Sequence, residues 1–127
     1  AAVSYGRLID PSTKKHTHIR RYDNKTLHLM MSDEFEVSDR RFEKGRDAFF
    51  ESLDQPDFTN QAMQYYNSSA EYVTTKDGKL VIRTKAEKAT WREWDRDKRH
   101  MVERTRNYTS GMVQTWNKFC FTGGVSE

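Results

Sequence analysis

The sequence contains little of what small domains commonly use to stabilise themselves. In 127 residues it has one cysteine, Cys120, and only two prolines. A single cysteine excludes a disulfide framework within the chain, so Cys120 is either a buried thiol or one half of a bridge to a partner elsewhere. No apolar run approaches the ~20 residues of a membrane-spanning helix, and the opening segment lacks the apolar core of a signal peptide.

Aliphatic residues are also scarce. Leu, Ile, Val and Phe together number 22 of 127, which is below the ~20% at which intrinsic disorder becomes a realistic alternative. The 16 aromatic residues and the net charge of only +3 argue against disorder, because disordered chains are typically poor in aromatics and strongly charged. We therefore expect one folded domain with a small core.

Charge is unevenly distributed along the chain. Residues 33–57 carry nine acids and four bases, whereas residues 83–106 carry nine bases and five acids. The bases of the second segment are interleaved with acids, and a face of mixed sign attracts phosphates weakly. The pattern favours a solvated surface over a nucleic-acid site, so we expect no nucleic-acid partner.

The first half of the chain predicts few regular elements. Residues 1–27 mix Pro, Ser, Thr, His and Lys with little periodicity, which indicates an extended leader. The apolar run at 27–31 predicts a first strand. Residues 38–60 are polar with scattered Phe, and the Phe pair at 49–50 would anchor either a short helix or a packed loop.

The second half is richer in residues that favour strands. Asp77-Gly78 is a turn signal, so strands are expected on either side of it. Segment 86–106 is ambiguous, since Trp91 and Trp94 fit a rough helical stripe while the many charges fit a long loop between strands. The sum of these features predicts an all-β protein, a β-sandwich or barrel-like unit.

The closing stretch, residues 109–127, is expected to form a strand, a tight turn and the start of a second strand. Successive side chains of a strand point to opposite sides, so Met112, Gln114 and Trp116 would share one face. Neither face of this strand is uniformly apolar.

Four stretches of the sequence carry a resemblance to a known family. They are LMMSDEF (29–35), NQAMQYY (60–66), VTTKDGKLVIRT (73–84) and YTSGMVQTWNKFCFTGG (108–124). They occur in the order seen in the opening half of family 16 glycoside hydrolases. The chain most resembles the relatives of that family associated with β-1,6-glucan synthesis in fungal-type cell walls, the Skn/Kre-type proteins. The resemblance runs from about Tyr5 to Gly124.

The resemblance implies a concanavalin-like jelly roll, an antiparallel β-sandwich whose concave face forms a groove for a β-glucan chain. Residues 28–127 would be the amino-terminal part of that sandwich, preceded by the leader at 1–27. The catalytic motif of the family, Glu-x-Asp-x-x-Glu, lies downstream of the FTGG strand. The resemblance therefore implies a truncated fragment with no catalytic residues of its own.

The resemblance also implies which residues contact substrate. Asn60, Gln64 and Tyr66 match a groove segment of the family. Sugar rings pack their C–H faces on indole, and their hydroxyls bind side-chain amides, so Gln114 and Trp116 are further candidates. The alternative is that Trp116 and Tyr66 fill the sandwich core.

Other acidic and histidine residues give weaker signals. In EWDRDK, Glu93 and Asp95 begin like the catalytic motif, but Lys98 stands where its second Glu belongs, so we interpret them as solvated charges. His16 and His18 lack the further ligands that a zinc site needs. We expect no metal ion and no cofactor.

Three sequons for N-glycosylation, at Asn24, Asn67 and Asn107, favour the secretory route. Together with the resemblance, they imply a glycoprotein whose full-length form is a type II membrane protein or lies at the cell surface.

Two functions from different classes follow. The first is the front half of a β-glucan-active enzyme, a transglycosylase or glucosidase of β-1,6-glucan and cell-wall biosynthesis, which lacks the downstream catalytic motif. The second is a non-catalytic glucan-binding or scaffolding protein of the wall-synthesis machinery. In both, β-glucan is the expected partner.

Overall fold

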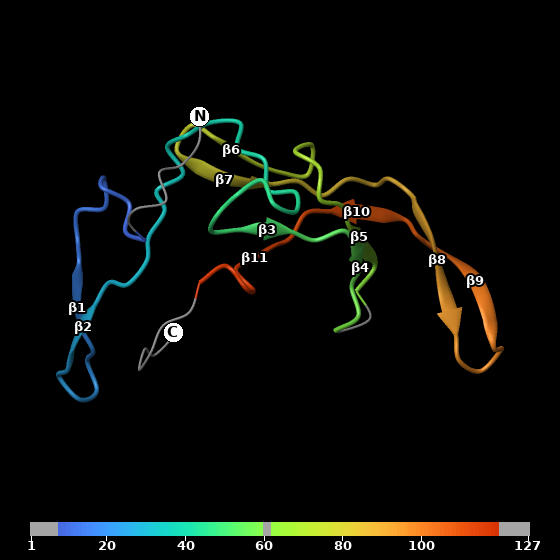
Figure 1. Ribbon diagram of the computed structural model, residues 1–127, viewed down its shortest axis with the longest axis horizontal. Helices are drawn as coiled ribbons and strands as arrows, with labels where there is room; N and C mark the ends of the chain where they lie inside the picture. The colour runs from blue at the N-terminus through green and yellow to red at the C-terminus, as the bar shows by residue number, and fades with distance from the viewer. Residues whose placement is uncertain (1–7, 60–61, 120–127) are drawn as a thin grey trace.

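The structure is a computed structural model that describes residues 8–59 and 62–119 (Figure 1), and within these residues it contains strands and no helix. The prediction of an all-β protein is confirmed. No helix in the described part of the chain is long and apolar enough to cross a membrane. The strands are β1 Thr17–Ile19, β2 Thr26–His28, β3 Glu51–Ser52, β4 Gln55–Pro56, β5 Gln64–Tyr66, β6 Val73–Lys76, β7 Lys79–Ile82, β8 Ala89–Asp95, β9 His100–Arg106, β10 Tyr108–Ser110 and β11 Val113–Gln114.

The strands form small sheets. The three-stranded sheet has the order β10-β5-β4, and β11-β3, β6-β7, β8-β9 and β1-β2 are two-stranded. All strand pairs are antiparallel except β10-β5, which is parallel. This arrangement is consistent with part of a β-sandwich, and the jelly-roll topology stays a prediction.

The turn predicted at Asp77-Gly78 is present between β6 and β7. Asp77 has φ 51° and Gly78 has φ 70°, and positive φ at both central residues is what a two-residue turn of this hand requires. Glycine adopts such a φ without steric cost, which explains why this dipeptide fixes the register of the hairpin.

Segment 86–106 is neither a helix nor a long loop but a hairpin of two seven-residue strands, β8 and β9. Along β8 the half-buried and exposed positions alternate strictly, which is the period of a strand. The connecting turn is closed by Asp95, whose Oδ1 accepts backbone N–H groups from Asp97 and Lys98 at 3.0 and 2.9 Å. The spacing of Trp91 and Trp94 suggested a helix only because apolar residues lie on both faces.

The leader and the first predicted strand also differ from expectation. Residues 17–19 and 26–28 pair as the hairpin β1-β2, so a strand occurs within the segment expected to be an extended leader. The strand expected at 27–31 is shifted toward the N-terminus, and residues 29–31 are irregular. The Phe pair at 49–50 lies in a packed loop that ends where β3 begins at Glu51.

The core is as small as the composition indicated. Phe42, Tyr72 and Val73 are buried together, with three partly buried apolar side chains packed against them. Phe42 and Phe50 meet edge to face with ring centroids 6.0 Å apart, a favoured geometry for aromatic pairs. The three packed side chains are Phe50, Leu80 and Val113.

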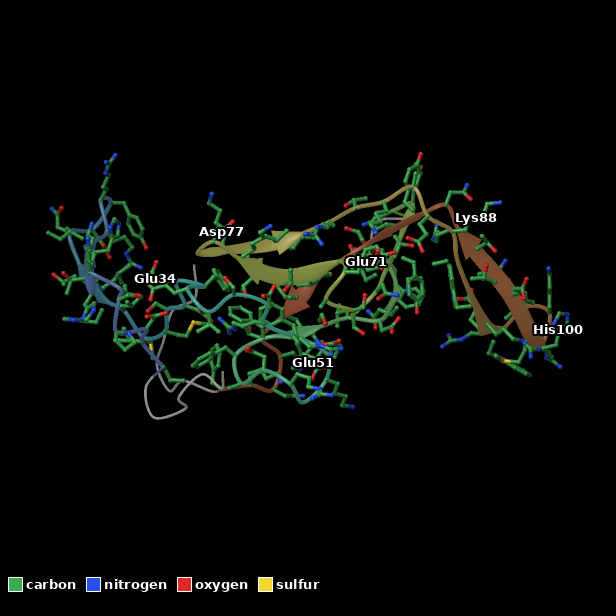
Figure 2. The ribbon with its side chains drawn as sticks, turned by 90° about the horizontal axis from the view of Figure 1, so that it is seen from above. Glu34, Glu51, Glu71, Asp77, Lys88 and His100 are labelled. Atoms are coloured by element: carbon green, nitrogen blue, oxygen red, sulfur yellow. The ribbon has the colours of Figure 1, made fainter. Side chains whose placement is uncertain are left out.

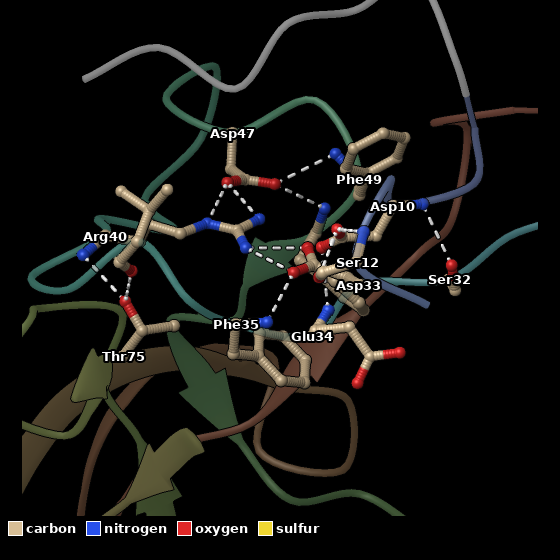
Figure 3. Close-up of polar contacts among 12 residues, drawn as sticks. Asp10, Ser12, Ser32, Asp33, Glu34, Phe35, Arg40, Asp47, Phe49 and Thr75 are labelled. Atoms are coloured by element: carbon tan, nitrogen blue, oxygen red, sulfur yellow. Dashed lines mark hydrogen bonds and ion pairs between the residues drawn. The ribbon is translucent and has the colours of Figure 1, made fainter. Parts of the chain in front are cut away.

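A buried ion-pair network lies beside this core (Figure 3). The Arg40 guanidinium donates to both oxygens of Asp33, at 2.8 and 2.6 Å, and to Asp47 Oδ2 through two nitrogens, at 3.1 and 2.8 Å. Asp47 Oδ1 accepts the backbone N–H groups of Phe49 and Phe50. The Arg40 N–H donates to Thr75 Oγ1 on β6. These bonds hold three irregular segments against the β6-β7 hairpin.

Candidate functional site

Two of the predicted substrate-binding residues meet at one acidic side chain on the central sheet. Gln64 and Tyr66 lie at alternate positions of β5 and therefore share a face. The Tyr66 hydroxyl donates to Asp57 Oδ2 at 2.7 Å, and Gln64 Nε2 donates to Tyr66 Oη at 3.0 Å and to Asp57 Oδ2 at 3.5 Å. We call these three residues the Asp57 cluster.

Asp57 is the organising residue of the cluster. It follows β4 directly, is buried, and its Oδ1 accepts from both the backbone N–H and the hydroxyl of Thr59 at 2.7 Å. The hydrogen bond to Asp57, helped by burial, raises the pKa of the Tyr66 phenol, so the phenol stays protonated and donates. Within residues 8–59 and 62–119, Gln64 makes its side-chain hydrogen bonds through Nε2, and its carbonyl oxygen is an acceptor that a ligand hydroxyl could use.

The opposite face of β5 is engaged in packing. Tyr65 donates to Asp54 Oδ1 at 2.8 Å and packs against Trp91 of β8 with ring centroids 5.3 Å apart. Burial, followed by the bond to Asp54, raises the pKa of Tyr65 to about 12. Strand β5 thus presents the Asp57 cluster on one side and supports the β8-β9 hairpin on the other.

Gln114 and Trp116 lie outside the Asp57 cluster. Gln114 is half-buried on β11 and pairs with Glu51 of β3. The strand ends at Gln114, and Trp116 lies in the following turn, where Lys118 N–H donates to the Thr115 carbonyl at 3.1 Å. The sequence predicted that Gln114 and Trp116 share one face of a strand, and this prediction is wrong because the strand ends at Gln114. Trp116 is 74% exposed and is not part of the small core formed by the described residues.

Asn60, the third predicted residue of the NQAMQYY segment, lies outside the described residues. Sequence reasoning missed Asp57. The chain carries only a weak signal for it, an acid five residues beyond the end of β3 and seven before Gln64. Its role depends on β4 pairing with β5, with Pro56 opposite Tyr65. The neighbouring Phe58 is 72% exposed, so an apolar ring adjoins the cluster.

Glu93 and Asp95 form ion pairs with the neighbouring Arg104. Arg104 donates to Glu93 Oε1 and to Asp95 Oδ2, each at 3.0 Å. The bond from the Trp91 indole, followed by the bond from Arg104, lowers the pKa of Glu93. Backbone N–H groups, chiefly that of Lys98, lower the pKa of Asp95. Both carboxylates are therefore ionised at neutral pH, a state in which neither can act as a general acid.

Asp33, Glu34 and His16 make local contacts. Asp33 binds Arg40, and Glu34 Oε1 accepts from the Thr13 hydroxyl at 2.6 Å. His16 Nε2 contacts the Thr13 carbonyl at 2.8 Å, and His18 is exposed on β1. Among residues 8–59 and 62–119, no three His, Cys, Asp or Glu side chains are grouped as metal ligands would be.

The three sequon asparagines occupy different environments. Asn24 is exposed in the β1-β2 loop with φ 55°. Asn107 is exposed between β9 and β10, but the hydroxyl of Thr109 in the same sequon is buried and donates to the Glu87 carbonyl. Asn67 is half-buried, and its Oδ1 accepts the Ser69 N–H at 2.9 Å.

Comparisons with known proteins connect the whole chain to one family. Residues 2–127 match the family model described as beta-glucan synthesis-associated protein SKN1/KRE6/Sbg1. The chain is 35% identical over 121 residues to the beta-glucan synthesis-associated protein SKN1 of Saccharomyces cerevisiae. It is 33% and 34% identical to the KRE6 and SKN1 proteins of Candida albicans. In each case the match covers 94% of this chain and 14% of the relative. No solved structure matches the chain significantly.

Proposed function

The chain belongs to the family of beta-glucan synthesis-associated proteins SKN1/KRE6/Sbg1, and on this basis we propose that it is a β-glucan-contacting part of a protein that builds cell-wall β-glucan. The chain spans 14% of the length of the relatives it matches, so the activity of the whole protein is also part of the proposal. A relationship to family 16 glycoside hydrolases, and a jelly-roll groove, belong to the same proposal.

The observation that carries the proposal is the Asp57 cluster. A carboxylate fixed by Thr59 and Tyr66 orients the Gln64 amide through its Nε2, and no described residue donates to the amide oxygen. Sugar hydroxyls both donate and accept, so fixed amides and carboxylates are suitable partners for them. The ring of Phe58, next to Asp57 in the sequence, and the ring of Trp116, outside the cluster, are both exposed, and we propose that each packs on a sugar ring of the glucan chain.

A binding role for these residues is favoured over a catalytic one. The only carboxylate pair that begins like a glycosidase motif, Glu93 and Asp95, is ionised and bound to Arg104. Retaining glycosidases require one carboxyl to be protonated as a general acid. If the full-length protein is a transglycosylase or glucosidase, its catalytic carboxylates come from another part of that protein, whereas in a scaffolding protein the glucan contact itself would be the function.

We extend the proposal to localisation and modification. Passage through the secretory pathway would bring the sequons to the glycosylation machinery. Asn24 is the most accessible of the three, because its whole sequon lies exposed on the β1-β2 hairpin. Mass spectrometry of the secreted or membrane-bound full-length protein should find a glycan at Asn24, and an unmodified Asn24 would count against this route.

Binding measurements test the central proposal. The full-length protein should bind β-1,3- or β-1,6-linked glucan oligosaccharides in titration calorimetry, and an α-linked glucan oligosaccharide of the same length should bind much more weakly. Equal binding of the α- and β-linked oligosaccharides, or no binding of either, would contradict it.

A further inference from the structure

The β8-β9 hairpin extends away from the rest of the molecule and has one fully exposed face. Figure 2 shows it projecting beyond Lys88 with His100 at its far end. Among the described strands, β8 and β9 pair only with each other. The exposed face carries three cross-strand pairs, which are Thr90–Thr105, Arg92–Glu103 and Trp94–Met101.

The opposite face of the hairpin is anchored and electrically balanced. Trp91 packs on Tyr65 of β5, and its indole N–H donates to Glu93 at 3.0 Å. Arg104 binds both Glu93 and Asp95 on this side. Glu93 and Asp95, two of the four acidic residues of the hairpin, are thus paired with Arg104 and lie on the face opposite Trp94.

The end of the exposed face combines apolar surface with positive charge. Trp94 and Met101 lie opposite each other, 59% and 45% exposed. The adjoining turn at 96–99 reads Arg-Asp-Lys-Arg, and all four residues are exposed. Asp95 fixes this turn by accepting two backbone N–H groups, so the bases are held beside the apolar pair.

We propose that this face of the β8-β9 hairpin docks on an anionic lipid surface, with Trp94 and Met101 entering the headgroup region. Tryptophan is enriched at membrane–water interfaces, where its apolar ring and polar N–H are both accommodated. Basic residues beside an anionic leaflet add attraction, and an apolar contact combined with a basic cluster gives the two signals that stable docking requires. The proposal does not depend on the glucan contact.

A lipid surface fits these features better than other occupants. A neutral glucan would leave Arg96, Lys98 and Arg99 without partners. Duplex DNA would pair with these bases through its phosphates, but its bases are stacked inside, so Trp94 and Met101 would stay in water. A bilayer interface places an anionic layer directly beside an apolar one. The long stems of Arg and Lys can follow apolar surface while their charges reach the headgroups.

Vesicle sedimentation of the complete chain tests the proposal. The chain should associate with vesicles of phosphatidylcholine mixed with phosphatidylserine, and not with vesicles of phosphatidylcholine alone. Arg96→Gln combined with Lys98→Gln should weaken this association about 25-fold, from about fivefold per basic residue. Trp94→Ser should weaken it about tenfold or more, as expected when an aromatic ring loses an apolar environment. Because all three side chains are exposed, these variants should fold.

Matched controls separate docking from general charge attraction. Lys14→Gln combined with Lys15→Gln makes the same change of net charge elsewhere, and Tyr22→Ser removes an aromatic side chain that is 79% exposed. Both should leave vesicle association unchanged. Brominated lipids should quench fluorescence of the unmodified chain, and Trp94→Phe should abolish most of that quenching.

Three results would overturn the proposal. One is failure to associate with the anionic vesicles. Another is equal weakening by the hairpin and control variants. The last is that the chain binds a polyanion such as DNA, or an acidic protein, but does not associate with the vesicles.

Discussion

The Tyr66 hydroxyl donates a 2.7 Å hydrogen bond to the buried carboxylate of Asp57, and this bond joins β5 to the segment that follows β4. We predict that Tyr66→Phe lowers the free energy of unfolding by about 1.5 kcal/mol, the lower end for a hydrogen bond to a charged group. It should also weaken β-glucan binding by the full-length protein, because Gln64 loses its support. Urea unfolding and titration calorimetry measure the two effects.

Tyr65→Phe is the matched control for this prediction. It removes the same hydroxyl one residue earlier, on the opposite face of β5, where the partner is Asp54. Its glucan affinity should equal that of the unmodified protein. If both variants bind glucan normally, the Asp57 cluster is structural and the site lies elsewhere.

Arg40 gives the largest expected stability effect. Arg40→Met leaves Asp33 and Asp47 buried without their shared base, and breaking a buried pair from one side costs about 3–5 kcal/mol. Arg41→Met removes a neighbouring arginine whose side chain is 60% exposed and paired with Glu43, which should cost at most about 1 kcal/mol. Chemical denaturation of both variants makes the comparison, and similar losses would show that the Arg40 network is not buried in solution.

Gly111 directly follows β10 and lies against the core residues Tyr72 and Val73. A Cβ at this position would be 2.1 Å from Val73 Cγ2 and 2.7 Å from the Tyr72 carbonyl oxygen. Gly111→Ala should therefore destabilise the protein by about 1–3 kcal/mol, as overpacking does. Gly45→Asn is the control, because Gly45 has φ 78° in open space and Asn tolerates that conformation. A lower melting temperature for Gly45→Asn than for Gly111→Ala would contradict this view of the core.

Alkaline pH should destabilise the protein through Tyr72. Its hydroxyl donates to Glu87 Oε2 at 2.5 Å, and this bond, followed by burial, raises the pKa of Tyr72 from 10.0 to about 12. The folded state holds the proton more tightly than the unfolded state. The contribution of this bond to stability is therefore complete below pH 10 and is lost as the pH rises to about 12.

Unfolding measured at several pH values checks the role of Tyr72. The series runs from about pH 9, one unit below the ordinary pKa of tyrosine, to about 12, the raised pKa of Tyr72. Tyr72→Phe should be less stable at pH 9 and should lose less stability on the way to pH 12. The pKa of Tyr65 is also raised to about 12, so both proteins lose the contribution of Tyr65 in this range. The effect of Tyr72 is therefore the difference in unfolding free energy between the unmodified protein and Tyr72→Phe. Parallel curves would contradict the assignment to Tyr72.

Some of the fold could be predicted because single residues dictate it. Asp77-Gly78 specifies a turn through positive φ, and the register of β6 and β7 follows from it. The β8-β9 hairpin could not be predicted in the same way. Its apolar residues lie on both faces and its charges hide the alternation, so the period of two becomes visible only when burial is known.

The candidate site was predicted in part for a related reason. Gln64 and Tyr66 were found from a sequence resemblance, and they do lie together on β5. Asp57 was missed because its position depends on strand pairing, which no local pattern specifies. The strand expected to reach Trp116 ends at Gln114, since the following turn places Asn117 at φ 60°.

Trp116 provides the most direct test of the proposed glucan contact. Its ring is 74% exposed, so Trp116→Ala should leave the unfolding free energy nearly unchanged, as surface substitutions usually do within about 0.5 kcal/mol. Tyr22→Ala, which removes another highly exposed ring from the β1-β2 loop, is the control. The decisive measurement is the affinity of the full-length protein for a β-glucan oligosaccharide, with the two variants beside it. We predict that Trp116→Ala weakens binding about tenfold, the size expected for losing one aromatic contact surface, while Tyr22→Ala binds normally. Unchanged affinity in Trp116→Ala, or equal losses in both variants, would contradict the account.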